Sequence, residues 1–242
     1  PHRVPCSHSG FGKLTNIDDG TVLQLRHGFQ LECRFCKKFE VNAAHNPQRT
    51  TAQMKEDGTR RRAIELLLMG LYGGSPQLLY RHKFGSELAE DVWNRFGRQC
   101  FNCGTPLKTA RHMALDHTRP LALLWQLDET ATALCKHCNG EKRDRPPVEF
   151  YSQPELERLS RITGIPMEEL LDPSPNLDAV DRLLSRLDWF FDEFLTQPQM
   201  TRIHDGKVPA ELLIKALQKT FNKCDADVPV NLVYEYEKRQ RG

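Results

Sequence analysis

Residues 100–145 read CFNCGTPLKTARHMALDHTRPLALLWQLDETATALCKHCNGEKRDR. Two Cys-x-x-Cys pairs frame this stretch, Cys100 with Cys103 and Cys135 with Cys138. Four thiolates in two such pairs fit the closed tetrahedral shell of a structural zinc ion, and four unrelated buried thiols would rarely fall twice at this short spacing. A unit this small buries little apolar surface, so we expect the zinc to supply folding free energy.

The segment between the pairs predicts two strands and a helix. We expect a short strand over residues 112–117, a second over residues 131–135, and a helix over residues 139–145 that Pro146 and Pro147 terminate. This order places strand, loop, strand and helix within one zinc-held unit.

Three polar residues of this unit are candidates for chemistry. Asp116 and His117 are adjacent near the end of the first expected strand, and Asn139 directly follows Cys138. A carboxylate and an amide carbonyl are hard oxygen ligands that suit Mg²⁺ or Mn²⁺ with positions left for water and a phosphate oxygen. A neutral imidazole near pH 7 can take a proton from an attacking water.

These residues together resemble the HNH (ββα-metal) nuclease family over about residues 98–145. The shared pattern is Cys-x-x-Cys, then Asp-His with Pro120 three residues on, then Cys-x-x-Cys-Asn-x-x-Lys. The resemblance implies that Asp116 and Asn139 hold one divalent cation and that His117 is the general base. It also implies hydrolysis of a phosphodiester bond to a 5′-phosphate and a 3′-hydroxyl. One position departs from the pattern: Thr130 stands where the family's middle Asn braces the loop that orients the His.

The N-terminal part of the chain predicts a second zinc site. Three cysteines are its firm candidates, and the fourth ligand is either His8, which we favour, or His45. The predicted ligands are Cys6, His8, Cys33 and Cys36. Basic and Phe residues surround them, so we expect residues 1–58 to form a zinc-ribbon-like module that contacts DNA. The alternative is that this module only anchors the N-terminus.

The charge is unevenly distributed along the 242 residues. The formal net charge is only +2, but residues 1–62 carry 11 Lys and Arg against 6 Asp and Glu, whereas residues 146–242 carry 12 against 17. Phosphate contacts need local cations, so the basic N-terminal part of the chain is the expected nucleic-acid-binding surface. The expected contacts are Lys37, Lys38, Arg60, Arg61, Arg62, Lys142, Arg143 and Arg145.

Apolar periodicity predicts further elements outside the zinc-held unit. Expected helices cover residues 60–72, 86–97, 177–194 and 209–222, and the alternation over residues 230–236 suggests an edge strand. The helix over residues 177–194 carries Trp189, Phe190, Phe191 and Phe194, which is more apolar surface than one face requires, so we expect it to mediate a homodimer.

The expected architecture is therefore α+β. It combines the zinc-ribbon-like module with a helical linker over residues 59–97, a ββα-metal nuclease core over residues 98–147 and a mainly helical region over residues 148–242. No run of about 18 apolar residues is present, and the eight cysteines suit a reducing compartment, so we expect a cytoplasmic protein without a membrane span. The resemblance favours a DNA endonuclease that cuts double-stranded DNA, of type II restriction or defence type. Homing or nicking nucleases and a non-catalytic zinc-dependent nucleic-acid-binding protein are the alternatives.

Overall fold

A computed structural model gives the structure of the chain and describes residues 13–15, 22–24, 51–203, 206–224 and 228–241. The chain divides into two compact units, Pro1–Thr50 and Thr51–Gly242. In the first unit, strand β1 (Lys13–Thr15) pairs antiparallel with β2 (Val22–Gln24). The expected N-terminal zinc ligands and cations lie outside the described residues. They are Cys6, His8, Cys33, Cys36, the alternative ligand His45, and Lys37 and Lys38.

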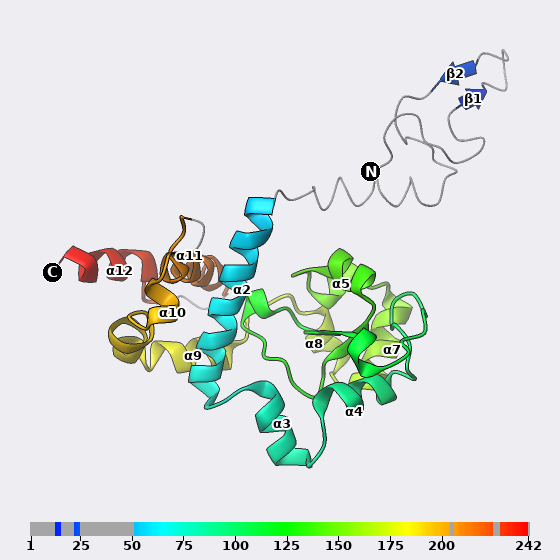
Figure 1. The fold of residues 1–242 in the computed structure, drawn as a ribbon, viewed down its shortest axis with the longest axis horizontal. Helices are drawn as coiled ribbons and strands as arrows, with labels where there is room; N and C mark the ends of the chain where they lie inside the picture. The colour runs from blue at the N-terminus through cyan, green and yellow to red at the C-terminus, as the bar shows by residue number, and fades with distance from the viewer. Residues whose placement is uncertain (1–12, 16–21, 25–50, 204–205, 225–227, 242) are drawn as a thin grey trace. The chain divides into compact units, whose positions relative to one another are not determined.

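The second unit combines many helices with one small sheet (Figure 1). In chain order its larger elements are α2 (Thr51–Tyr72), α3 (Pro76–Phe84), α4 (Leu88–Arg95), β3 (Ala114–Asp116), β4 (Thr132–Leu134), α5 (Lys136–Lys142), α6 (Pro147–Phe150), α7 (Gln153–Thr163), α8 (Met167–Leu171), α9 (Leu177–Leu184), α10 (Pro198–Thr201), α11 (Pro209–Phe221) and α12 (Leu232–Arg241). Short 3₁₀ turns cover Ala110–His112 (η1) and Leu121–Leu123 (η2), and Trp189–Phe194 forms a π-helix (η3).

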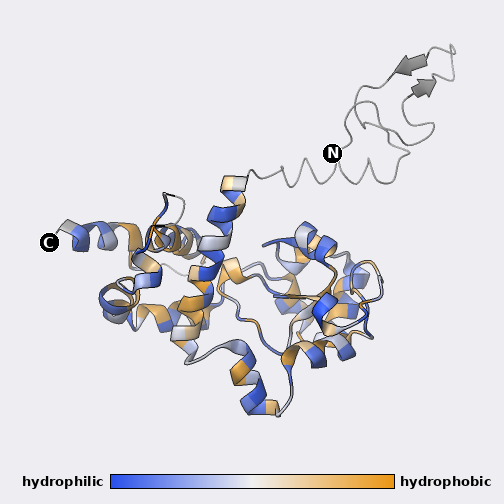
Figure 2. Cartoon of the chain, viewed as in Figure 1, coloured by the Kyte–Doolittle hydropathy of each residue, from blue (hydrophilic) through white to orange (hydrophobic). Residues whose placement is uncertain are grey.

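One hydrophobic core joins α2 to the C-terminal helices. Helix α2 packs against α9 and α11, and α11 also packs against α10 and α12 (Figure 1). This helical core consists of buried apolar residues that include Leu67, Leu183, Phe190 and Leu213. Hydrophobic and hydrophilic residues alternate in short runs along these helices, as amphipathic elements around one core require (Figure 2).

A second hydrophobic core lies around the four cysteines of the expected zinc unit. It joins α4, β4, α7 and α8, and its buried residues include Val92, Phe101, Leu134 and Leu159. We call it the strand core. The elements that share it extend beyond residues 98–147 on both sides, because α4 precedes this range and α7 and α8 follow it.

The strand–strand–helix order expected from the sequence is present. Strands β3 and β4 pair antiparallel, with Asp116 opposite Thr132, and α5 follows β4 after a single residue. Helix α5 begins earlier than expected because Cys135 caps it, its Sγ accepting a hydrogen bond from the backbone N–H of Cys138. It ends at Lys142, and the next residue, Arg143, adopts a positive φ of 53°.

Two expectations for the C-terminal region differ from the structure. Residues 232–241 form helix α12, so the edge strand expected over residues 230–236 was wrong. The expected continuous helix over residues 177–194 is divided into α9 and the π-helix η3 by a turn at residues 185–186. Phe190, Phe191 and Phe194 are buried in the helical core, so they do not offer the apolar surface from which we expected a dimer.

Within the part of the chain that the structure describes, none of the helices combines the length and apolar character that crossing a membrane requires.

Candidate metal centre and active site

Four cysteines from the two Cys-x-x-Cys pairs converge on one point. The Sγ atoms of Cys100, Cys103, Cys135 and Cys138 all lie within 4.8 Å of one another. Cys100 and Cys138 are buried, and Cys103 is exposed. This cluster could hold a metal ion such as zinc, as the sequence predicted.

Polar neighbours surround the sulfur atoms. The side-chain amide of Asn102 donates a hydrogen bond to Cys138 Sγ at 3.3 Å, and the Thr105 hydroxyl lies 3.1 Å from Cys103 Sγ. Burial raises the pKa of Cys103, but hydrogen bonds with Thr105, Cys100 and Cys138 together outweigh it and lower that pKa to about 6. A metal needs thiolate ligands, and the lowered pKa of Cys103 favours its thiolate form.

Asp116 lies at the end of β3 and is paired with a buried lysine. Asp116 is only 5% exposed, and Nζ of Lys142 lies 2.7 Å from its Oδ2 atom. The same Nζ donates a 2.8 Å hydrogen bond to the backbone carbonyl of His117. Burial raises the pKa of Asp116, although the Lys142 ammonium acts in the opposite direction. Lys142 itself is completely buried, so the structure gives it this internal contact in place of the phosphate contact expected from the sequence.

His117 follows Asp116 and contacts a residue from a distant helix. The ring is 8% exposed, and NH2 of Arg61 on α2 lies 3.4 Å from its Nδ1 atom. A guanidinium can only donate, so Nδ1 accepts and the neutral ring carries its proton on Nε2. Burial, followed by the charges of Arg61 and Lys142, lowers the pKa of His117 to about 3. His117 is therefore an uncharged imidazole at neutral pH.

Thr130 braces the loop that follows His117. Its backbone N–H and hydroxyl donate hydrogen bonds to Asp128 Oδ1 at 2.8 and 2.5 Å. Its carbonyl accepts a 2.6 Å bond from the hydroxyl of Thr118, which is the residue directly after His117. Thr130 thus stabilises a turn through its hydroxyl, and the turn holds the backbone beside His117.

The donor set at Asp116 is compatible with a divalent cation. Although Lys142 is close, the buried Oδ2 of Asp116 accepts no hydrogen bond of normal geometry within the described residues. That oxygen already has the Lys142 ammonium as its charge partner, so a divalent cation would share the carboxylate with Lys142. Asn139 lies on α5 between Cys138 and Lys142 with a half-buried side chain and supplies a second hard oxygen. Asp116 and Asn139 therefore each carry an oxygen of the type that Mg²⁺ or Mn²⁺ binds.

The other expected cations differ in what they contact. Arg60 lies 2.8 Å from Asp57 and 3.9 Å from Asp144, and Arg62 lies 3.4 Å from Glu65. Arg143 and Arg145 follow α5 and bond through their guanidinium groups to nearby carbonyl oxygens of Gly140, Glu141 and Lys142. Of Arg60, Arg61 and Arg62, only Arg61 contacts His117.

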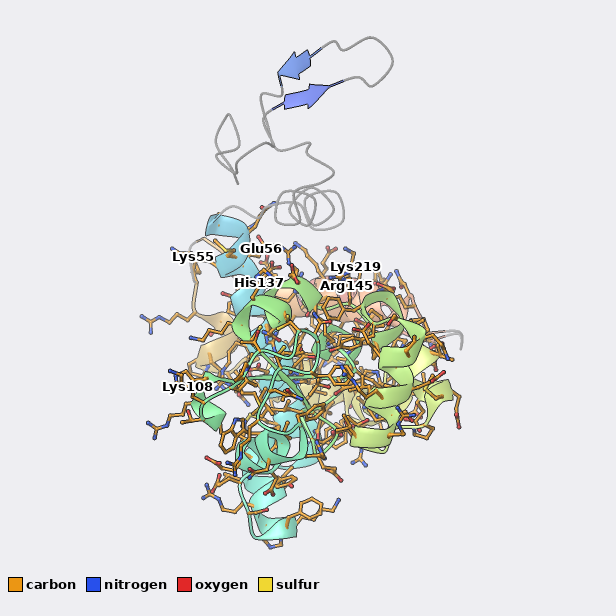
Figure 3. All side chains as sticks on the ribbon, turned by 90° about the vertical axis from the view of Figure 1, so that its right-hand side faces the viewer. Lys55, Glu56, Lys108, His137, Arg145 and Lys219 are labelled. Atoms are coloured by element: carbon orange, nitrogen blue, oxygen red, sulfur yellow. The ribbon has the colours of Figure 1, made fainter. Side chains whose placement is uncertain are left out.

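Two other histidines of this region, His112 and His137, are exposed, whereas His117 is buried. His137 on α5 is at the surface with Arg145 nearby in the view of Figure 3, and its Nε2 lies 3.3 Å from Glu141. His112 is exposed and shares a hydrogen bond with the Thr109 hydroxyl. Figure 3 also shows Lys108 projecting from the surface. Because His112 is exposed and lies in the same segment, its substitution can serve as a control for the substitution of His117.

Sequence reasoning missed the internal role of Lys142. A signal was present, because Lys142 follows Cys138 by four residues and the two share one face of a helix. Cys138 must face the metal cluster, so Lys142 had to be turned inward as well.

Comparisons with models of protein families, with curated proteins and with solved structures gave no match to this chain.

Proposed function

We propose that the chain is a metal-dependent DNA endonuclease of HNH type that hydrolyses phosphodiester bonds to 5′-phosphate and 3′-hydroxyl ends. The observation that carries the proposal is the buried Asp116–His117 pair at the end of β3, beside the cysteine cluster and α5. A carboxylate that can bind a cation and an imidazole that can accept a proton are two groups that a one-metal phosphodiesterase needs.

Asp116 and Asn139 would hold the divalent cation. The ion, when bound, supplies Lewis-acid stabilisation of charge on the phosphate and the leaving oxygen. The chain's own residues prepare the rest of the site. Lys142 fixes Asp116 through the ion pair and fixes the His117 backbone through its carbonyl, so one ammonium positions both members of the pair.

His117 would be the general base, and Arg61 would control access to its Nδ1 atom. With Nδ1 accepting from Arg61 and Nε2 protonated, neither nitrogen of the ring is free to take a proton. A phosphate oxygen is a charged acceptor and binds a guanidinium more strongly than a neutral imidazole does. Substrate binding would therefore draw Arg61 onto the phosphate and free Nδ1 to accept the proton of the attacking water.

The test is cleavage of defined plasmid DNA with Mg²⁺ by the full-length, zinc-loaded protein. We expect His117→Ala to lower the rate by a factor of about 10² to 10⁴, the usual worth of a general base. The matched control is His112→Ala, which removes an exposed histidine of the same segment. If His117→Ala cuts as fast as the unchanged protein, the proposal is overturned.

The form of the products distinguishes the biological roles. Discrete linear fragments with ligatable 5′-phosphate ends support a type II restriction or defence enzyme acting on both strands, as a homodimer. Nicked circles alone support a nicking enzyme. DNA binding without any cleavage supports a non-catalytic binding protein, in which the contact of Arg61 with His117 persists on DNA.

A further inference from the structure

His117 is one of the residues that line a pocket. Its volume is about 290 Å³, and its lining comes from α2, from the start of α3 and from the segment between β3 and β4. His117 forms part of its wall, together with Gln77 of α3 and Gln126 of the segment before β4. Whatever enters this pocket is therefore in contact with the expected general base.

The floor of the pocket is apolar and belongs to the helical core. Leu68 of α2 and Leu121 of η2 line it, and both are nearly inaccessible to solvent. Apolar side chains of this kind can pack against the face of an aromatic ring. Small-molecule sites usually combine such a floor with a few polar groups that fix orientation, and a volume of about 290 Å³ is at the lower end of their range.

Two amide side chains and one cation supply those polar groups. Gln77 is exposed and Gln126 is half-buried, and the side chain of neither makes a hydrogen bond within the described part of the chain. Each amide offers donors and an acceptor on one planar group, which can pair with two atoms of a base edge. Arg62 also lines the pocket and lies 3.4 Å from Glu65, a second lining residue, so an adjoining phosphate would compete with this carboxylate for the guanidinium.

We propose that this pocket binds the nucleoside joined to the phosphate that the Asp116–His117 pair attacks, and that Gln77 and Gln126 select its base. The inference rests on the proposed nuclease function and extends it to a specificity site. Because His117 is shared between the pocket and the active site, the occupant has to be the covalent neighbour of that phosphate. One nucleoside fits this volume, whereas a base pair does not, so the base enters unpaired and unstacked.

The experiment is cleavage of an oligonucleotide pool randomised around the cut, with every fragment end sequenced. The unchanged protein should prefer one base at the nucleotide next to the cut. Gln126→Ala and Gln77→Ala should each reduce that preference by about fivefold or more, which is the lower end of the discrimination given by one bidentate contact. The matched control is Gln153→Ala on α7, whose exposed amide instead bonds to Glu157. This control should retain the full preference.

Failure of this inference and failure of the nuclease proposal give different results. The pocket's role is overturned if the protein cleaves DNA without a base preference at that nucleotide, or if both glutamine variants keep the preference unchanged. Neither result contradicts the nuclease proposal. If no protein cuts at all, the nuclease proposal fails, and the pocket is tested by equilibrium dialysis with deoxynucleoside 5′-monophosphates. Binding that Gln126→Trp abolishes by filling the pocket would support the nucleoside site. Absent binding, or binding that this variant does not change, would overturn it.

Discussion

The ammonium of Lys142 lies 2.7 Å from Oδ2 of Asp116, and both side chains are shielded from solvent. This ion pair connects the last turn of α5 to the end of β3, the two elements that carry the candidate active site. A buried pair of this kind adds little net stability over an apolar replacement, but removing one partner leaves an uncompensated buried charge.

Lys142→Met should therefore lower the free energy of unfolding by about 3–5 kcal/mol. The measurement is urea denaturation with zinc in excess. The double variant Lys142→Met with Asp116→Asn should recover part of the loss, because it removes both charges. Lys136→Met, at an exposed position of the same helix, should change stability by no more than about 0.5 kcal/mol. If Lys142→Met and Lys136→Met change the free energy of unfolding equally, the ion pair of Lys142 with Asp116 does not contribute as stated.

The cysteine cluster predicts a specific zinc stoichiometry. We expect two zinc ions per chain by elemental analysis, one in the described cluster and one at the N-terminal ligands expected from the sequence. Cys103→Ser should remove one of them and unfold the strand core, because a structural zinc site contributes about 10–16 kcal/mol, as much as a whole domain's stability. Cys224→Ser lies outside the cluster and should keep both ions. Full zinc content in Cys103→Ser would contradict the assignment.

The residues that the sequence predicted well are those whose roles depend on local spacing. The two Cys-x-x-Cys pairs need only a few residues each, so the convergence of their four sulfur atoms followed from the pattern. The segment at residues 230–236 could not be assigned this way. Its alternation resembles a strand, but the side chain of Asn231 caps a helix by accepting from the backbone N–H of Tyr234, and Leu232 is buried in the helical core. The contact of Arg61 with His117 spans 56 residues, and only the packing of α2 brings the two together.

Arg61 should be required for cleavage although it lies outside the zinc-held unit. Removing one donor that stabilises transition-state charge usually costs a factor of about 10² to 10³, so we expect Arg61→Ala to lower the single-turnover cleavage rate by that amount. Its stability should change by no more than about 0.5 kcal/mol, because the side chain is largely exposed. Arg202→Ala, which removes an exposed arginine on another element, is the control for a general loss of positive charge. If Arg61→Ala and Arg202→Ala cleave DNA at the same single-turnover rate, Arg61 has no specific role in cleavage.

The burial of His117 predicts how stability depends on pH. Its pKa is lowered from 6.5 to about 3, first by burial and then by the charges of Arg61 and Lys142, so below pH 6.5 the unfolded chain binds a proton that the folded chain does not. The stability from this group is present above pH 6.5 and is lost as the pH falls toward 3.

Between pH 7 and pH 5 the loss attributable to His117 amounts to about 2 kcal/mol. The measurement is urea denaturation at both pH values without added Mg²⁺, on the unchanged protein and on His117→Asn. Asp116, Lys142 and Arg61 are present in both proteins, so their own titration largely cancels in the difference. The unchanged protein should lose about 2 kcal/mol more than the variant. Equal losses would mean that His117 has the same pKa in the folded and the unfolded chain, which would contradict a pKa lowered by burial.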